Sequence, residues 1–170
     1  MITIDNRVIS DKHPPYVIAE ISSNHGGSLD KALNTICAAK ESGADAVKLQ
    51  TYKPSSMTLD CNEDDFVIRD GLWQGYKLFD LYNEACTPYE WHKKLFDYAK
   101  KINLTIFSTP FDNDAVDLLE KLGTPAFKIA SFEIIDLSLI KYAAQKGKPL
   151  LMSTGMASEK EIDEAVEVAK

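Results

Sequence analysis

The sequence lacks the features that mark membrane and secreted proteins. No apolar run approaches the roughly 20 residues that a membrane-spanning helix requires. The opening residues, MITIDNRVIS, contain no basic segment followed by an apolar one, so we expect no secretory signal. Cysteine is scarce, with three residues (Cys37, Cys61 and Cys86) and no paired motif spacing. This odd number favours reduced thiols in a cytoplasmic protein.

Signature motifs for several chemistries are also missing. The sequence has no two-histidine or cysteine metal-ligand motif, no P-loop, no nucleophile elbow and no dinucleotide-binding glycine fingerprint. The formal net charge is -7 and the pI is about 5.0, which argues against a nucleic-acid or anionic-membrane partner. The composition, 45% hydrophobic and 26% charged, is ordinary for a globular chain with one core.

Apolar runs of strand length alternate with helical patterns along the chain. The pattern predicts a hairpin turning at Asp5-Asn6, and then strands at 16–21, 45–51, 104–109, 126–131 and 149–154, each followed by a helix. Thr87-Glu90 and Ser158-Glu161 have capping-box spacing at the starts of two of these helices.

Strict alternation of strand and helix predicts a parallel α/β sheet. The chain has about five β/α units after the hairpin, where a parallel (β/α)8 TIM barrel has eight. We therefore expect residues 1–170 to be the N-terminal part of a TIM-barrel domain, truncated here. A small doubly wound domain is the alternative.

The stretch 52–86 is too long for an ordinary connection between a strand and a helix. Barrel enzymes place substrate loops at this end of a strand. Four aromatic residues lie about three positions apart in it, which fits either an amphipathic packing helix or an aromatic wall facing the substrate. They are Trp73, Tyr76, Phe79 and Tyr82.

Polar residues occupy one end of strands that should be almost wholly apolar. They are Glu20, Lys48, Gln50, Ser108, Thr109, Lys128, Ser131, Glu133, Ser153 and Thr154. In a barrel these strand ends meet at the rim that holds the active site. Two lysines among hydroxyls suit an anion with more than one charged group, such as a phosphate plus a carboxylate. The alternative is that Lys48 and Lys128 form structural ion pairs with Glu20 and Glu133.

The histidines and glycines give weaker signals. His25 follows the first strand at the same rim, where it is either a satisfied loop residue or a ligand or acid. Gly26-Gly27 either form a turn or leave backbone amides free for an anion. We expect His13 and His92 to be peripheral.

Together, the rim segments resemble a known family. The segments IAEISSNHGGSLDKA, ADAVKLQTYK, FSTPFD, KIASFE and LLMSTGMAS are similar, in order and spacing, to the strand motifs of the sialic-acid synthases. The resemblance covers nearly the whole chain. It implies a cytoplasmic homodimeric enzyme that condenses phosphoenolpyruvate with an amino-sugar aldehyde. The family's later strands and its C-terminal antifreeze-like domain are absent from this segment.

Two departures from the neuraminate pattern favour the pseudaminic acid synthase branch. Phe132 stands where neuraminate synthases usually have glycine, and residues 72–92 resemble the pseudaminate pattern. The implied sugar is a 2,4-diacetamido-2,4,6-trideoxy hexose, whose apolar groups would contact Phe132, Trp73 and Tyr76. N-acetylneuraminate or legionaminate synthesis is the alternative. An inactive anion- or partner-binding fragment is the alternative of another class.

The resemblance also implies roles for individual residues. Lys128, Ser131 and Ser153 would hold the phosphate of phosphoenolpyruvate, and Lys48, Gln50 and Thr109 its carboxylate end. The implied catalytic residues are Glu20, which would orient the sugar and the water shell of a metal, and Glu133, which would serve the attacking water or the aldehyde. Asn24 and His25 would shape the sugar site, and Ser108 and Thr154 are further substrate-binding candidates. The implied cofactor is Mn2+, Mg2+ or Co2+, with ligand histidines expected beyond residue 170.

Overall fold

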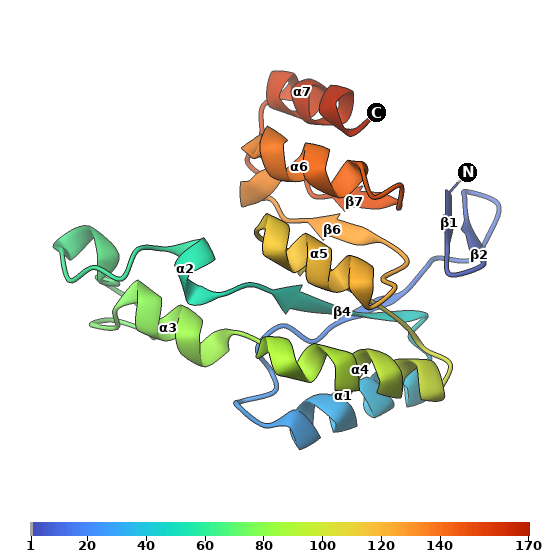
Figure 1. Cartoon of the computed structure of the whole chain (residues 1–170), viewed down its shortest axis with the longest axis horizontal. Helices are drawn as coiled ribbons and strands as arrows, with labels where there is room; N and C mark the ends of the chain where they lie inside the picture. The colour runs from blue at the N-terminus through green and yellow to red at the C-terminus, as the bar shows by residue number, and fades with distance from the viewer. Residues whose placement is uncertain (1) are drawn as a thin grey trace.

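The computed structural model describes residues 2–170 and begins with an antiparallel hairpin (Figure 1). The hairpin pairs β1 (Ile2–Ile4) with β2 (Arg7–Ile9). Asp5 and Asn6 have φ angles of 47° and 67°, the left-handed conformation that a two-residue hairpin turn requires. The predicted hairpin and its turn are confirmed.

A five-stranded parallel sheet follows, with its strands in the order of the sequence. The strands are β3 (Ile18–Glu20), β4 (Ala46–Thr51), β5 (Thr105–Pro110), β6 (Phe127–Ile129) and β7 (Leu150–Met152). Sequential parallel neighbours are the arrangement of a (β/α)8 barrel, because the strand order of a doubly wound sheet reverses at a switch point. The chain therefore forms a half barrel, as predicted.

Helices cover one face of this sheet (Figure 1). They are α1 (Leu29–Glu41), α4 (Tyr89–Lys101), α5 (Asn113–Lys121), α6 (Leu137–Ala144) and α7 (Glu159–Ala169). The Ser158-Glu161 capping box is present at the start of α7. The box predicted at Thr87 is wrong, because α4 begins after Pro88 and has no side-chain cap.

The register decides which strand residues face the helices. Neighbours paired in a parallel sheet point to the same side, and successive residues alternate between sides. We call the side that carries Val47 and Leu49 the helix face, and the side that carries Lys48 and Gln50 the inner face. Residues of the helix face pack with α1, α4, α5 and α6 in one buried core. Burying each large aliphatic side chain there contributes about 1.5–3 kcal/mol.

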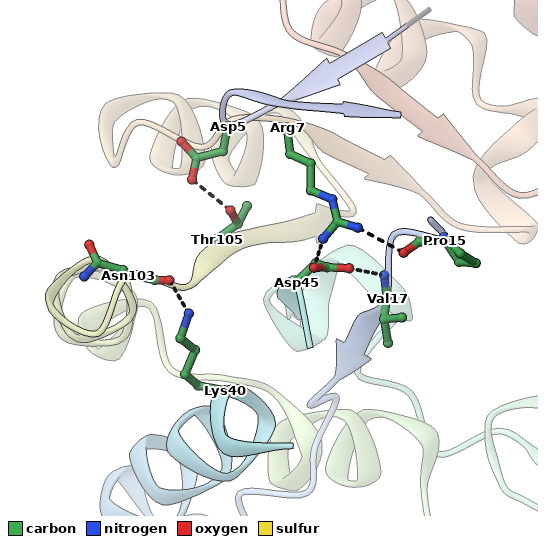
Figure 2. Close-up of polar contacts among 8 residues, drawn as sticks. All are labelled: Asp5, Arg7, Pro15, Val17, Lys40, Asp45, Asn103 and Thr105. Carbon is green, nitrogen blue, oxygen red and sulfur yellow. Dashed lines mark hydrogen bonds and ion pairs between the residues drawn. The ribbon is translucent and has the colours of Figure 1, made fainter. Parts of the chain in front are cut away.

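The hairpin is fastened at the amino end of the sheet (Figure 2). The Thr105 hydroxyl donates to Asp5 at 2.8 Å. Arg7 forms an ion pair with Asp45, and the same carboxylate accepts the Val17 N–H at 2.7 Å. These contacts fix the hairpin at the end of the sheet opposite the predicted rim.

The long insertion after β4 projects from the carboxyl end of the sheet (Figure 1). It contains α2 (Pro54–Met57), a 3-10 turn η1 (Asp64–Phe66) and α3 (Leu78–Ala85). Trp73 and Tyr76 precede α3, so the predicted aromatic helix includes only Phe79 and Tyr82. A hydrogen bond from Ser56 to Asp112 ties α2 to the start of α5.

Two further expectations concern the whole chain. The cysteines Cys37, Cys61 and Cys86 are all free thiols. Across residues 2–170, none of the helices combines the length and the apolar character needed to cross a bilayer.

Candidate active site

Three strands meet at a polar cluster on the inner face. Glu20 is in register with Lys48, and Gln50 with Thr109, so these four side chains share that face. Lys48 forms an ion pair with Glu20. Its ammonium also donates to the Thr109 hydroxyl at 3.3 Å. The cluster therefore links β3, β4 and β5 through one lysine.

Lys128 brings a second ammonium to the same face from β6. Burial lowers the pKa of Lys128, and the positive charge of Lys48 lowers it further, against the opposing effect of Glu133 and Glu20. The ammonium donates to the backbone carbonyl of Ile129. Within residues 2–170, no carboxylate lies at ion-pair distance from Lys128. Of the two structural ion pairs in the alternative interpretation, the pair of Lys48 with Glu20 is therefore present. The pair of Lys128 with Glu133 is not formed in the described part of the chain.

This charge arrangement favours an anionic ligand. A partly buried ammonium without a paired charge is unfavourable unless it loses its proton or gains a counter-ion. Lys48 and Lys128 lie close enough to influence each other, and only one of them has a carboxylate partner. A negatively charged group of a ligand would compensate the charge of Lys128, which has no carboxylate partner in the described part of the chain.

Glu133 lies just beyond β6 in the 3-10 turn η2 (Phe132–Ile135). Its Oε2 is buried and has no hydrogen-bond partner among the described residues. Burial raises the pKa of Glu133, and Lys128 opposes this shift. A carboxyl group whose pKa is raised accepts a proton more readily than an ordinary glutamate, which suits a group that takes up or gives a proton.

Two serines flank Lys128. Ser153 follows β7, and its N–H donates to the Ile129 carbonyl at 3.0 Å. Ser131 lies against the next loop, where a Cβ added at Gly155 would stand 3.1 Å from the Ser131 hydroxyl. The loop thus approaches Ser131 closely because residue 155 has no side chain. Thr154 and Phe132 are exposed at the same strand ends.

Ser108 does not belong to this cluster. It is in register with Leu49 and Phe127, so it points to the helix face, whereas Thr109 points to the inner face. The prediction that both residues line the ligand site is wrong for Ser108, because adjacent strand residues alternate between faces. The Ser108 hydroxyl is instead 2.6 Å from that of Thr51.

The prediction that His92 is peripheral is also wrong. It is fully buried in α4 and lies 2.8 Å from the Thr51 hydroxyl. The sequence contained a signal for this burial. His92 precedes Leu95 and Ala99 by three and seven positions, so all three lie on one face of α4.

His25 and the glycines after it form a closed turn. The Gly27 N–H donates to His25 Nδ1 at 3.1 Å, and the ring packs edge-on against Trp91 at 5.5 Å. The N–H of Gly26 donates to Ser23, so these amides are used within the turn and the free-amide alternative is not observed. Burial lowers the pKa of His25, and the Ala85 backbone opposes this shift.

A pocket of about 360 Å³ adjoins the cluster at the carboxyl end of β4. It opens beside Gln50 and is lined by the insertion, with Trp73 and Tyr82 among its walls and Ser23, Tyr52, Leu81, Glu84 and Ala85 completing it. Asn24 is exposed beside it in sequence. Tyr76 contacts the Trp73 ring at 5.8 Å but does not line the pocket. A larger cavity of about 610 Å³ lies at the opposite end of the sheet, beside Asn6 and Thr105.

The described residues do not fit a metal ion. In residues 2–170 no three His, Cys, Asp or Glu side chains gather closely enough to hold one. Glu20 is engaged with Lys48 rather than with other carboxylates. No chemical step is therefore assigned to a metal at these residues.

The half barrel and its rim define the chain as part of a TIM-barrel domain with a cluster of charged and polar side chains at the carboxyl ends of its strands. The model of the NeuB family matches residues 35–170, and the chain belongs to this family.

The chain is similar in sequence and structure to known sugar-acid synthases. It is 50% identical over 157 residues to a pseudaminic acid synthase of Helicobacter pylori, covering 92% of this chain and 46% of that protein. It is 37% identical over 153 residues to an N,N'-diacetyllegionaminic acid synthase of Campylobacter jejuni, covering 89% and 46%. A crystal structure of an N-acetylneuraminic acid synthetase from Leptospira borgpetersenii matches with a TM-score of 0.85 and 31% identity, covering 99% and 54%. The chain spans about half the length of these proteins.

Proposed function

We propose that this chain provides the phosphoenolpyruvate site of a synthase that makes pseudaminic acid. The reaction condenses phosphoenolpyruvate with a 2,4-diacetamido-2,4,6-trideoxy hexose and releases phosphate. The observation that carries the proposal is the pair of lysines on the inner face, of which Lys128 has no carboxylate partner within residues 2–170. The sequence similarity to pseudaminic acid synthases supports the same assignment.

The arrangement suits both charged groups of phosphoenolpyruvate. Its phosphate would lie between Lys128, Ser131 and Ser153, where an ammonium and two hydroxyls can all donate. Its carboxylate would lie on the other side, against Gln50 and Thr109, with Lys48 between the two groups. In this position Lys48 would exchange part of its contact with Glu20 for the ligand.

The proposed chemistry forms one C–C bond and breaks one C–O bond. C3 of phosphoenolpyruvate adds to the aldehyde carbon of the open-chain sugar, and the aldehyde oxygen takes a proton. Water attacks C2, which carries positive charge at that stage, and the intermediate then loses phosphate by cleavage of its C–O bond. The carboxylates of Glu20 and Glu133 would stabilise the charge at C2. Glu133 would hold the proton that the water gives up.

The sugar would occupy the pocket beside Gln50. The walls formed by Trp73, Tyr82 and Leu81 offer apolar surface to a methyl and two acetamido groups, and Glu84 and Ser23 offer hydrogen bonds. Phe132 is 72% exposed at the end of β6, on the rim outside this pocket. We propose that it contacts the sugar from that side. The proposal also includes a cytoplasmic, homodimeric protein that depends on a divalent metal held by other residues.

Calorimetric titration of the intact protein tests the ligand site. We expect phosphoenolpyruvate to bind at least about tenfold more tightly than inorganic phosphate or pyruvate, since a tenfold ratio needs only 1.4 kcal/mol from the second charged group. Equal affinities for phosphoenolpyruvate and phosphate would contradict a site for both groups. No binding of any of the three would favour a protein that uses this rim for another purpose.

A further inference from the structure

A hydrogen-bonded network of three buried polar side chains lies on the helix face, directly behind the candidate site. Thr51 in β4, Ser108 in β5 and His92 in α4 are each completely buried. Thr51 Oγ1 lies 2.6 Å from Ser108 Oγ and 2.8 Å from His92 Nε2. His92 Nδ1 lies 3.0 Å from the Pro88 carbonyl oxygen, which is the last group of the network.

The Pro88 carbonyl oxygen determines the direction of every hydrogen bond in this network. A carbonyl oxygen only accepts, so His92 Nδ1 carries the proton and donates to Pro88. In the neutral ring Nε2 then accepts from Thr51, whose oxygen in turn accepts from Ser108. Burial lowers the pKa of His92, which favours this neutral form.

The network lies one residue from two ligand-facing side chains. Gln50 precedes Thr51 and Thr109 follows Ser108, and strand alternation places this second pair on the inner face. Thr51 is also paired with Pro110 in the sheet, at the last position of both strands. The hydrogen bond between the Thr51 and Ser108 side chains therefore joins the ends of β4 and β5.

We infer that Thr51, His92 and Ser108 form a positioning network that holds Gln50 and Thr109 against the ligand. His92 extends the network to the start of α4, directly after the insertion that walls the sugar pocket. The network touches no ligand itself and acts through the ends of β4 and β5. Its effect on the ligand rests on the proposed function, while its effect on the strand ends does not.

The decisive variants are Thr51→Val, which keeps the shape but removes the hydroxyl, and Thr51→Ser, which keeps the hydroxyl. Thr124→Val is the matched control, because Thr124 is also fully buried and donates to the Ala126 carbonyl at 2.8 Å, at the amino end of β6. Amide hydrogen exchange of the intact protein is the first readout. In Thr51→Val we expect exchange about tenfold faster at Thr109, with Ile129 unchanged, because the opening is local.

Nitrogen NMR and kinetics complete the test. The His92 ring should show a protonated Nδ1 and an unprotonated Nε2. Thr51→Val should raise the KM for phosphoenolpyruvate by about five- to tenfold and the KM for the sugar by less, because Gln50 and Thr109 both face phosphoenolpyruvate whereas only Gln50 borders the sugar pocket. Thr51→Ser should restore both readouts, and Thr124→Val should move neither.

The possible results distinguish a failure of the positioning inference from a failure of the proposed function. Uniformly faster exchange across the sheet, or unchanged exchange at Thr109, would overturn the inference. A proton on His92 Nε2 would overturn it as well. Local exchange in a protein that does not use phosphoenolpyruvate would support the positioning of the strand ends and reject the proposed function.

Discussion

Glu20 and Lys48 form an ion pair between neighbouring strands on the inner face of the half barrel. Lys128 lies on the same face, where the positive charge of Lys48 contributes to lowering its pKa. Within residues 2–170 it has no carboxylate partner of its own. A purely structural role would pair both lysines. The unequal pairing leaves one positive charge for a ligand, and most of the predictions below depend on it.

Removing the Lys128 ammonium should weaken use of phosphoenolpyruvate. A hydrogen bond to a charged group contributes about 1.5–3 kcal/mol, so Lys128→Ala should raise the KM for phosphoenolpyruvate by roughly 10- to 100-fold. Lys141→Ala is the control, since Lys141 is exposed on α6. Steady-state kinetics of both variants measure this change in the KM for phosphoenolpyruvate. A Lys128→Ala enzyme with unchanged KM and kcat would exclude Lys128 from the phosphate site.

Substitution at Glu133 should increase stability in a pH-dependent way. A raised carboxyl pKa means that the folded protein disfavours the charged form, so the penalty is present above the folded pKa and disappears as pH falls to the ordinary value of 4.5. Glu133→Gln should therefore raise the Tm at pH 7, by roughly 2–4 °C for each 1 kcal/mol removed, and not below pH 4.5.

Thermal denaturation between pH 4 and pH 8 measures this difference. Glu63→Gln, at an exposed position of the insertion, is the matched control substitution. A Glu133→Gln protein less stable than the parent at pH 7 would show that the charged form is favoured in the folded state. The variant should lose activity whatever its stability, because it lacks the proton-holding group.

Gly155 should matter for the ligand, while Gly147 should matter for stability. A Cβ at position 155 would stand 3.1 Å from the Ser131 hydroxyl, which must then shift by a few tenths of an ångström. We expect Gly155→Ala to raise the KM for phosphoenolpyruvate about three- to tenfold, because displacing a positioned donor weakens its hydrogen bond.

Gly147 provides the contrast for this prediction. Its φ is 67° and nothing lies within 4 Å of an added Cβ. Gly147→Ala should lower the free energy of unfolding by about 1 kcal/mol and leave the KM unchanged. If the two variants showed the reverse pattern, the packing of Ser131 against the loop after β7 would have no role in binding.

Residues 1–170 produced as a separate polypeptide should self-associate or be only marginally stable. β3 and β7 are the edge strands of the open sheet, and unpaired edges favour association. Phe132, Ile135 and Met156 are exposed at 72%, 64% and 82%. Light scattering coupled to size exclusion, with a phosphate-release assay, should show oligomers without turnover. A stable monomer with synthase activity would contradict this expectation.

The sequence predicted the strands well because buried parallel strands are short apolar runs bounded by turns. It also predicted the rim, since the carboxyl ends of parallel strands must meet. It failed where the face of a strand mattered. Ser108 and Thr109 are neighbours in sequence, and only alternation along β5 separates the buried network from the ligand site.

Other errors have two causes, contacts between distant segments and a helix start displaced by one residue. Ser56 and Asp112 are 56 positions apart, and no local pattern indicates that their bond ties the insertion to α5. The Thr87-Glu90 spacing suited a capping box, but α4 begins one residue later than the box requires. The spacing of His92 from Leu95 and Ala99 indicated its burial, but no local pattern indicated its hydrogen bond with Thr51, which is 41 positions away.

Phosphate release by the intact protein tests the central claim most directly. The account predicts that release requires phosphoenolpyruvate together with a sugar, and that it is faster with 2,4-diacetamido-2,4,6-trideoxy hexose than with N-acetylmannosamine at equal concentrations. Faster release with N-acetylmannosamine would move the protein to the neuraminate branch. No release with either sugar, in the presence of a divalent metal, would contradict the proposed synthase.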